Sequence, residues 1–182
     1  FTMDDLRSFA GIPPQYEWKC LGEATVIAPM NTKSLAYPYT DSYNFGPYGF
    51  SYASDRWEVR NAWIVRFDPR NEDHPYHHKD IYIDKETLDA LYSFAYDQKE
   101  ELWKIIWHNK RWSDDTDLTG EWYKSWPGIE KPRDMRIISD TIVNVQTGTG
   151  NRIEFWDAEG TPLESKGKVR RYIDVGRLTK GR

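Results

Sequence analysis

The chain has 182 residues, a formal net charge of −4 and 15% aromatic side chains. That length suits one domain with a hydrophobic core, and the mildly acidic balance argues against a dedicated nucleic-acid binder, which carries a basic surface. A single cysteine, Cys20, excludes an internal disulfide and a cysteine-cluster metal site. The longest apolar run, residues 24–30, is too short to span a membrane.

The first predicted element is a long, bent strand within residues 11–28. Tyr16, Trp18 and Cys20 fall on one side of this extended segment, and Gly22 predicts a bulge. Residues 29–55, rich in Pro, Gly, Tyr, Asn and Ser, are expected to form a long irregular loop. Loops of this length usually bind or cover something.

The clearest strand signal is the period-two alternation over residues 56–67. Apolar side chains occupy one face and charged side chains the other, which predicts a sheet with one dry and one solvated face. The dry face holds Trp57, Val59, Trp63, Val65 and Phe67, and the wet face holds Arg56, Glu58, Arg60 and Arg66.

Further strands are predicted over residues 79–84, 91–96 and 102–112, which together form an antiparallel meander. A polar loop or short helix follows over residues 113–135. A hairpin is expected from strands 135–146 and 152–156, with the turn at 147–151. The last residues, 161–182, carry a net charge of +5 and are expected to form a surface-bound tail.

These elements predict a mainly β fold, a curved antiparallel sheet with few short helices and long loops. We expect Trp57, Trp63, Trp103 and Trp107 to share one concave side. Residues two apart on a strand share a face, and a single dry side avoids burying the Arg and Lys residues opposite.

None of the motifs predicts a catalytic site. His74, His77 and His78 contain enough imidazoles for a metal, but Pro75 prevents a helix that would gather them, so we expect no bound metal. The acidic loop from Asp115 has Trp126 where a calcium loop needs glutamate. We therefore expect no catalytic residues, no cofactor and no enzyme activity. The aromatic stripes remain open to two interpretations, an ordinary core or the lining of a hollow that holds an apolar ligand.

Several blocks resemble a proteobacterial envelope family of unknown function. The blocks follow the family order over most of residues 9–112, and the end at Gly176 to Arg182 is also similar. They are YEWKCLGE at 16–23, APMN at 28–31, DRWEVRNAWIVR at 55–66, HPYHHKDIYIDKETL at 74–88 and AYDQKEELWK at 95–104.

That family is grouped with the lipoprotein-sorting fold of LolA, LolB and LppX, a curved half-barrel whose cavity holds acyl chains. The resemblance implies a periplasmic or outer-membrane-associated protein that works with an RND-type permease or an outer-membrane protein. Family members are longer, and the chain begins with Phe1. We therefore expect residues 1–182 to be a single domain, the C-terminal portion of a longer precursor.

The sequence and the resemblance together predict a non-enzymatic carrier of a lipid-like hydrophobic ligand. The rival hypothesis is a structural subunit of an envelope assembly whose half-barrel is filled by its own side chains or by a partner chain. Expected cavity residues are Trp57, Val59, Trp63, Val65, Trp103, Ile105, Trp107, Tyr82, Tyr92 and Phe94, and Arg60 and Arg66 are expected to meet a polar headgroup.

Overall fold

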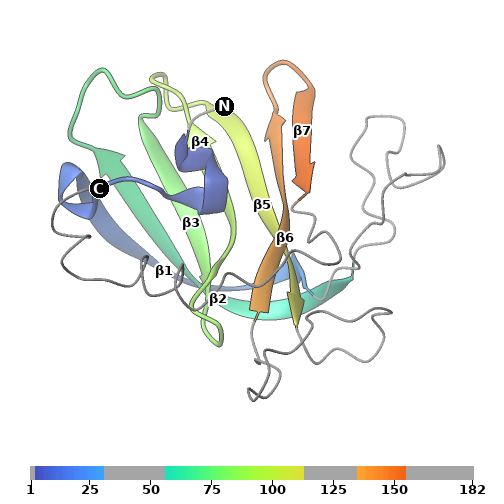
Figure 1. Ribbon diagram of the computed structural model, residues 1–182. Helices are drawn as coiled ribbons and strands as arrows, with labels where there is room; N and C mark the ends of the chain where they lie inside the picture. Colours follow the sequence, from blue (N-terminus) through green and yellow to red (C-terminus); the bar gives the residue numbers. More distant parts are fainter. Residues whose placement is uncertain (1–2, 31–55, 113–134, 155–182) are drawn as a thin grey trace, which may run out of the picture. The chain divides into compact units, whose positions relative to one another are not determined.

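The computed structural model describes residues 3–30, 56–112 and 135–154, which form one antiparallel sheet (Figure 1). Its strands follow chain order, so each pairs with the next along the chain. The expected loops at 31–55 and 113–134 and the tail after 154 lie outside the described residues. The strands are β1 (Tyr16–Pro29), β2 (Trp57–Pro69), β3 (His78–Asp84), β4 (Ala90–Tyr96), β5 (Leu102–Trp112), β6 (Met135–Asn144) and β7 (Thr149–Glu154).

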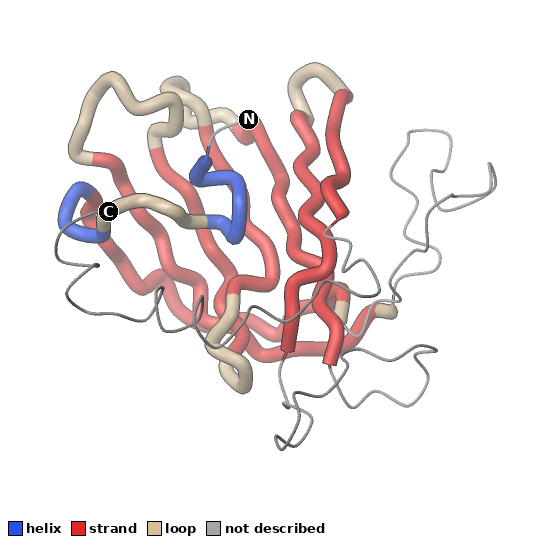
Figure 2. Tube along the Cα trace, in the orientation of Figure 1, coloured by secondary structure: helices blue, strands red, loops and turns tan. Residues whose placement is uncertain are grey.

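The predicted antiparallel meander is confirmed, and the sheet is open, with β1 and β7 at its edges. Helix is confined, in the described part of the chain, to two short 3-10 turns, η1 (Met3–Ser8) and η2 (Pro13–Gln15) (Figure 2). The predicted bulge in the first strand is also confirmed. The register shifts between Cys20 and Gly22, and Gly22 has φ +136, a conformation that favours glycine.

Strand register defines two faces of the sheet. Ile64 pairs with Tyr82, Tyr82 with Tyr92, and Tyr92 with Trp107, so these side chains share one face. Phe94 and Ile105 pair on the same side, and we call it the aromatic face. The opposite face, here the strap face, carries residues such as Phe67, Lys79, Ser93, Ile106 and His108.

The sheet curls toward its aromatic face. Ala28 and Met30, at the end of β1, form a buried cluster with Ala62 of β2 and Leu91 of β4. Tyr82, Tyr92 and Met135 pack against this cluster. The β1 strand therefore reaches β4 across the aromatic face although two strands, β2 and β3, separate them in the pairing order.

The strap face is covered by η1, which we call the strap. Figure 1 shows this segment, in dark blue, crossing one face of the sheet, where it contacts β4, β5 and β6. Phe9 follows the strap and packs edge-to-face on Tyr16 and Phe67, with ring centroids 5.1 and 5.5 Å apart. Tyr16, Phe67 and Ile81 form the second buried cluster. The strap and Phe9 together thus cover the strap face from β2 to β6.

The expectation that four tryptophans share one side is wrong. Trp57 and Trp63 lie on the strap-face side of β2, whereas Trp107 pairs with Tyr92 on the aromatic face. Trp103 sits at a bulge opposite Ala95 and Tyr96, and its ring packs on Tyr76, 5.5 Å away. A bulge inserts one residue, so it breaks the two-residue alternation on which the expectation depended.

The expectation that the sheet avoids burying cationic side chains is also wrong. Lys79, Lys104 and Lys110 are all buried, together with His108. The predicted wet face of β2 is partly covered too, because Arg60 and Arg66 are only partly exposed. The structure accommodates these charges by pairing them with carboxylates rather than by exposing them.

Candidate functional site

The aromatic face is built around three rings from neighbouring strands. Tyr82 and Tyr92 are a cross-strand pair, and their ring centroids are 4.6 Å apart. Phe94 meets both rings edge-to-face, at 5.5 Å from Tyr82 and 5.6 Å from Tyr92. All three side chains are half-buried. This arrangement leaves a ring surface that is partly open and has no fixed charge of its own.

Burial makes this surface a poor environment for charge. It raises the pKa of Tyr92 to about 12, with the neighbouring Tyr82 adding to the shift. Burial also raises the pKa of Tyr82 and of Tyr96, and in both cases nearby Asp80 contributes second. The tyrosine hydroxyls therefore stay neutral at any physiological pH, and the face suits apolar groups better than ions.

The expected cavity residues divide between the two faces. Tyr82, Tyr92, Phe94, Ile105 and Trp107 share the aromatic face, where all are half-buried. Trp57, Val59, Trp63 and Val65 lie on the other side of β2, and Trp57 and Val59 are 45% and 70% exposed. Trp103 packs beside Tyr76. The structure thus brings together five of these residues and separates the others from them.

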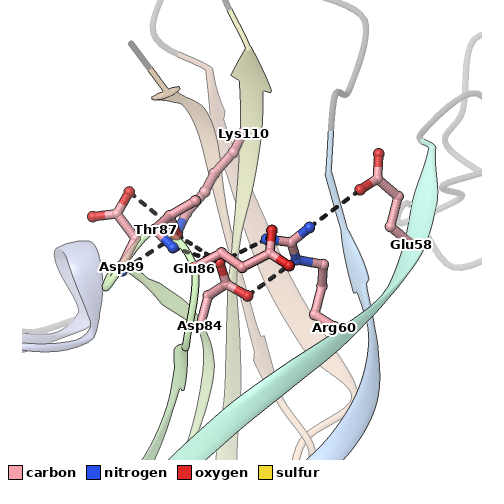
Figure 3. A network of polar contacts seen from close by, with 7 residues as sticks. All are labelled: Glu58, Arg60, Asp84, Glu86, Thr87, Asp89 and Lys110. Carbon is pink, nitrogen blue, oxygen red and sulfur yellow. Dashed lines mark hydrogen bonds and ion pairs between the residues drawn. The ribbon is translucent and has the colours of Figure 1, made fainter.

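Both expected headgroup arginines are already paired. Arg60 binds Asp84 with two hydrogen bonds, Nε to Oδ1 at 3.0 Å and a terminal nitrogen to Oδ2 at 2.8 Å, and it also reaches Glu86 at 2.9 Å (Figure 3). Arg66 binds Asp80 with the same bidentate geometry, through hydrogen bonds of 2.6 and 2.8 Å. The bidentate edge of each guanidinium is therefore occupied by a carboxylate of the protein itself.

The Arg60–Asp84 pair is strongly held. Burial acts to raise the pKa of Asp84, but hydrogen bonds from Arg60 and Thr87 outweigh it, and the pKa lies below its ordinary value. Asp84 accepts from both the backbone N–H and the hydroxyl of Thr87, each at 2.9 Å. The carboxylate is thus the fixed centre of the turn between β3 and β4.

Sequence reasoning missed a group of polar side chains on β5 and β6. Lys110 extends from β5 to the β3–β4 turn, where its Nζ lies 3.4 Å from Asp89 Oδ2 (Figure 3). Asn109 precedes it, and Thr141 pairs with Trp107 across the two strands. The run of polar residues 108–110 inside a predicted strand was the available signal.

On the strap face, Asp5 is held by two buried lysines. Lys104 Nζ donates to Asp5 Oδ2 at 3.0 Å and lies 2.7 Å from the Tyr76 hydroxyl, which also bonds to Asp5. Lys79 Nζ is 3.7 Å from the same carboxylate and donates to the Ser8 carbonyl at 3.3 Å. This network ties the strap to β3 and β5.

A second polar chain fixes the end of the strap. Ser8 Oγ lies 2.6 Å from His108 Nε2, and His108 Nδ1 lies 2.5 Å from Asp140 Oδ1. An ionised carboxylate accepts, so His108 Nδ1 carries a proton and donates it to Asp140. Ser8 Oγ is also 3.1 Å from Ser93 Oγ. We call Ser8, His108 and Asp140 the clasp.

The clasp has the order of groups found in a Ser–His–Asp catalytic triad. All three side chains are fully buried, however, and Ser8 belongs to the strap that buries them. A movement of the strap that admitted a substrate would withdraw Ser8 from His108. The arrangement therefore secures the strap and does not present a nucleophile.

Two of the histidines of residues 74–78 contact one another, with His77 Nδ1 2.9 Å from His78 Nδ1. His74 Nδ1 accepts from the Tyr76 backbone N–H at 3.1 Å, and His78 stacks on Tyr96 with ring centroids 4.2 Å apart. Within residues 3–30, 56–112 and 135–154, no group of three or more His, Cys, Asp or Glu side chains is placed to hold a metal ion. None of the helices found there has the length and apolar character needed to cross a bilayer.

Comparison with known proteins gives a family and a fold. The sequence model of the family described as "Protein of unknown function (DUF1329)" matches residues 1–168. An uncharacterized protein of Pseudomonas aeruginosa is 29% identical over 108 residues, which make up 57% of this chain and 23% of that protein. The matched segment is thus less than a quarter of the curated relative.

Two solved structures resemble the chain. A domain described as an outer membrane lipoprotein-sorting protein, from Vibrio parahaemolyticus, has a TM-score of 0.51 at 16% identity and covers 93% of this chain and 53% of its own. A protein of the matched family from Desulfovibrio piger has a TM-score of 0.45 at 14% identity and covers 90% of this chain and 47% of its own. The Vibrio likeness establishes the lipoprotein-sorting-like fold, as the sequence predicted.

Proposed function

The chain belongs to this family of unknown function, DUF1329, and from that starting point we propose that it binds a lipid-like hydrophobic ligand without catalysing a reaction. The binding surface is the aromatic face, with Tyr82, Tyr92 and Phe94 at its centre and Ile105 and Trp107 beside them. Removing apolar area from water supplies the affinity, at about 25 cal/mol per Å².

The half-exposure of the aromatic face carries the proposal. Ring clusters in a closed core are buried, whereas these three rings remain partly open on the side toward which the sheet curls. The raised pKa of Tyr92 is further support, because it indicates that the surroundings of this side chain disfavour a charged group. An apolar surface of this kind is typical of a site for a hydrophobic ligand or partner.

The envelope is the proposed location, either the periplasm or the outer membrane. The support is the lipoprotein-sorting-like fold and the printed description of the Vibrio domain as an outer membrane lipoprotein-sorting protein. An RND-type permease or an outer-membrane protein is the proposed partner. This last step rests on the family resemblance of the sequence alone.

Lipid extraction and mass spectrometry of the protein purified from its native membrane test the proposal. We expect co-purified lipid in the unmodified protein and a several-fold loss in Phe94→Ala. Trp57→Ala is the matched control, since it removes an exposed aromatic residue from the other side of the sheet. Equal lipid content in both variants and the parent would contradict binding at the aromatic face.

The rival function, a structural subunit, predicts a different result. The protein would then carry no extractable lipid, and Phe94→Ala would weaken its association with other envelope proteins or lower its stability. Measuring thermal unfolding on the same samples separates a lost ligand from a damaged fold.

A further inference from the structure

Two buried polar side chains on the aromatic face each have an atom without a hydrogen-bond partner. Asn109 of β5 and Thr141 of β6 are both 0% exposed. Within the part of the chain that the structure describes, Asn109 Oδ1 and Thr141 Oγ1 make no hydrogen bond. Buried polar groups are nearly always satisfied, so two unsatisfied atoms on one face indicate a place where something polar binds.

Strand register places these two side chains close together. Trp107 pairs with Thr141 and Asn109 pairs with Ser139, so all four side chains point to the aromatic face. The register is continuous between the two pairs, which makes Asn109 and Thr141 diagonal neighbours across β5 and β6. Diagonal neighbours are about 7–8 Å apart, and their side chains shorten that gap. One small polar head can therefore contact both.

The two polar side chains continue a row of apolar ones. Four half-buried side chains pair in succession from β2 to β5, namely Ile64, Tyr82, Tyr92 and Trp107. Thr141 is the next position of this row, on β6. An alkyl chain lying across the strands on these rings would therefore bring its polar end to Asn109 and Thr141.

The chemistry of the two atoms selects the head. Asn109 donates its amide nitrogen to Ser139 Oγ at 2.7 Å, which leaves a carbonyl oxygen that can accept but not donate. The Thr141 hydroxyl can do either. A head that satisfies both must carry an O–H or N–H of its own. An ionised carboxylate has none, and its oxygens would be repelled by Asn109 Oδ1.

The charged side chains on these strands are committed elsewhere. His108 and Asp140 point to the strap face, where they bind one another. Lys110 extends away to the β3–β4 turn, where its Nζ lies 3.4 Å from Asp89 Oδ2 (Figure 3). Arg152 of β7 is on the aromatic face, but it has an interaction of its own. The two atoms left to bind a head therefore belong to uncharged groups.

We propose that the ligand of the aromatic face is an uncharged amphiphile with a hydroxyl-bearing head, a fatty alcohol or an acylglycerol, which Asn109 and Thr141 bind. This inference rests on the proposed function and specifies its ligand class. A ligand hydroxyl donates to Asn109 Oδ1, the Thr141 hydroxyl donates to a ligand oxygen, and the alkyl chain lies along Trp107 and Tyr92.

Calorimetric binding of three probes with the same alkyl chain tests the assignment. Decanol can donate and accept a hydrogen bond, decyl methyl ether can accept but not donate, and decanoate is an anion. Each probe is titrated, below its solubility limit and micellar concentration, into the full chain and its variants. We expect decanol to bind the parent roughly threefold to tenfold more tightly than the ether does, and more tightly than decanoate.

Two variants each remove one of the polar atoms. Asn109→Leu should weaken decanol binding to the level of the ether, whose own binding should change little because it has no proton to donate. Thr141→Val keeps the shape of the side chain while removing the hydroxyl, and it should weaken decanol binding several-fold. It carries the test should Asn109→Leu fail to fold.

The chain offers a matched pair of control variants, Asn61→Leu and Thr25→Val. Asn61 and Thr25 are exposed partners across β1 and β2, joined by a hydrogen bond of 2.9 Å, and they lie on the side of the sheet opposite the rings. Neither control should change the binding of any probe.

The outcomes separate the two proposals. If none of the probes binds the parent, the proposed function itself fails. If decanol binds no more tightly than the ether, or if decanoate binds most tightly, the head assignment is overturned and the carrier function stands. The assignment is also overturned if Asn109→Leu and Thr141→Val bind decanol as well as the controls do, because Asn109 and Thr141 would then bind water alone.

Discussion

Tyr82 and Tyr92 meet across the β3–β4 pair with ring centroids 4.6 Å apart and 33° between their planes. Each ring is thus partly covered by the other. Burial and, second to it, this contact raise the pKa of Tyr92.

Tyr92 should destabilise the fold at high pH. Its pKa is raised to about 12 in the folded chain, against 10.0 for an ordinary tyrosine. The unfolded chain therefore loses this proton first, so stability is fully present below pH 10 and falls as the pH rises toward 12. Urea unfolding at several pH values measures the loss, and Tyr92→Phe should reduce it. An unchanged slope in Tyr92→Phe would show that Tyr92 is not its source.

Removing the Asp5 carboxylate should be costly. Asp5→Ala leaves the buried ammoniums of Lys79 and Lys104 without their shared anion, so we expect a loss of about 3–5 kcal/mol in unfolding free energy. The control is Asp68→Ala, which breaks the exposed pair with Lys19 and should cost about 1 kcal/mol or less. Similar losses in the two variants would mean that the strap network contributes no more than a surface ion pair.

His78 should make the fold sensitive to mild acid. Burial, followed by the nearby charge of Arg66, lowers its pKa below 6.5 in the folded chain. The unfolded chain therefore binds the proton more readily, and stability is present above pH 6.5 and lost as the pH falls below it. His78→Asn should remove this dependence on pH. The neighbouring His77 is exposed and its Nδ1 lies 2.9 Å from His78 Nδ1, so His77→Asn measures how much that contact contributes. NMR titration of the two imidazoles gives the direct comparison, and an ordinary pKa for His78 would contradict this account.

Substitution of Gly22 should destabilise the fold because of its backbone conformation alone. Its φ of +136 is unfavourable for residues with a β-carbon, although a β-carbon added there would meet no atom within 4 Å. We expect Gly22→Ala to lower stability by about 1–3 kcal/mol, measured by urea unfolding. Glu23→Ala, one residue further along, should leave the stability close to that of the parent because it removes only exposed contacts, with Lys85 and Trp63. A neutral Gly22→Ala variant would show that β1 can bend without glycine.

Local patterns predicted the strands well. The alternation over residues 56–67 matches β2, and the segments at 79–84, 91–96 and 102–112 match β3, β4 and β5 to within a residue. The bulge at Gly22 was also predictable, because glycine within a strand signals an irregular backbone. These features depend on near neighbours in the chain, which a sequence pattern records directly.

The assignment of faces was less predictable because bulges interrupt the alternation. The bulge at Trp103 forms because Lys104 and Leu102, on either side of it, pair with the consecutive residues Ala95 and Tyr96. The sequence of neither strand alone reveals this bulge. Buried lysines were missed for a related reason. Lys79 and Lys104 look like solvent-facing positions until Asp5, far away in the sequence, supplies their counter-charge. The pairing of Arg60 with Asp84 likewise depends on two separate strands.

The clasp also bears on the order in which the protein folds. Ser8 and His108 are 100 residues apart in the chain, and Asp5 and Lys104 are 99 apart. Closing a loop of that length costs entropy before any contact offsets it, so we expect the strap to dock after β5 and β6 have come together. During synthesis the strap is made first, and its partners follow from 71 residues (Lys79) to 100 residues (His108) after Ser8. Until then the nascent sheet exposes Phe67, Ile81 and Ile106, and this interval is when the chain is most open to aggregation or to a chaperone.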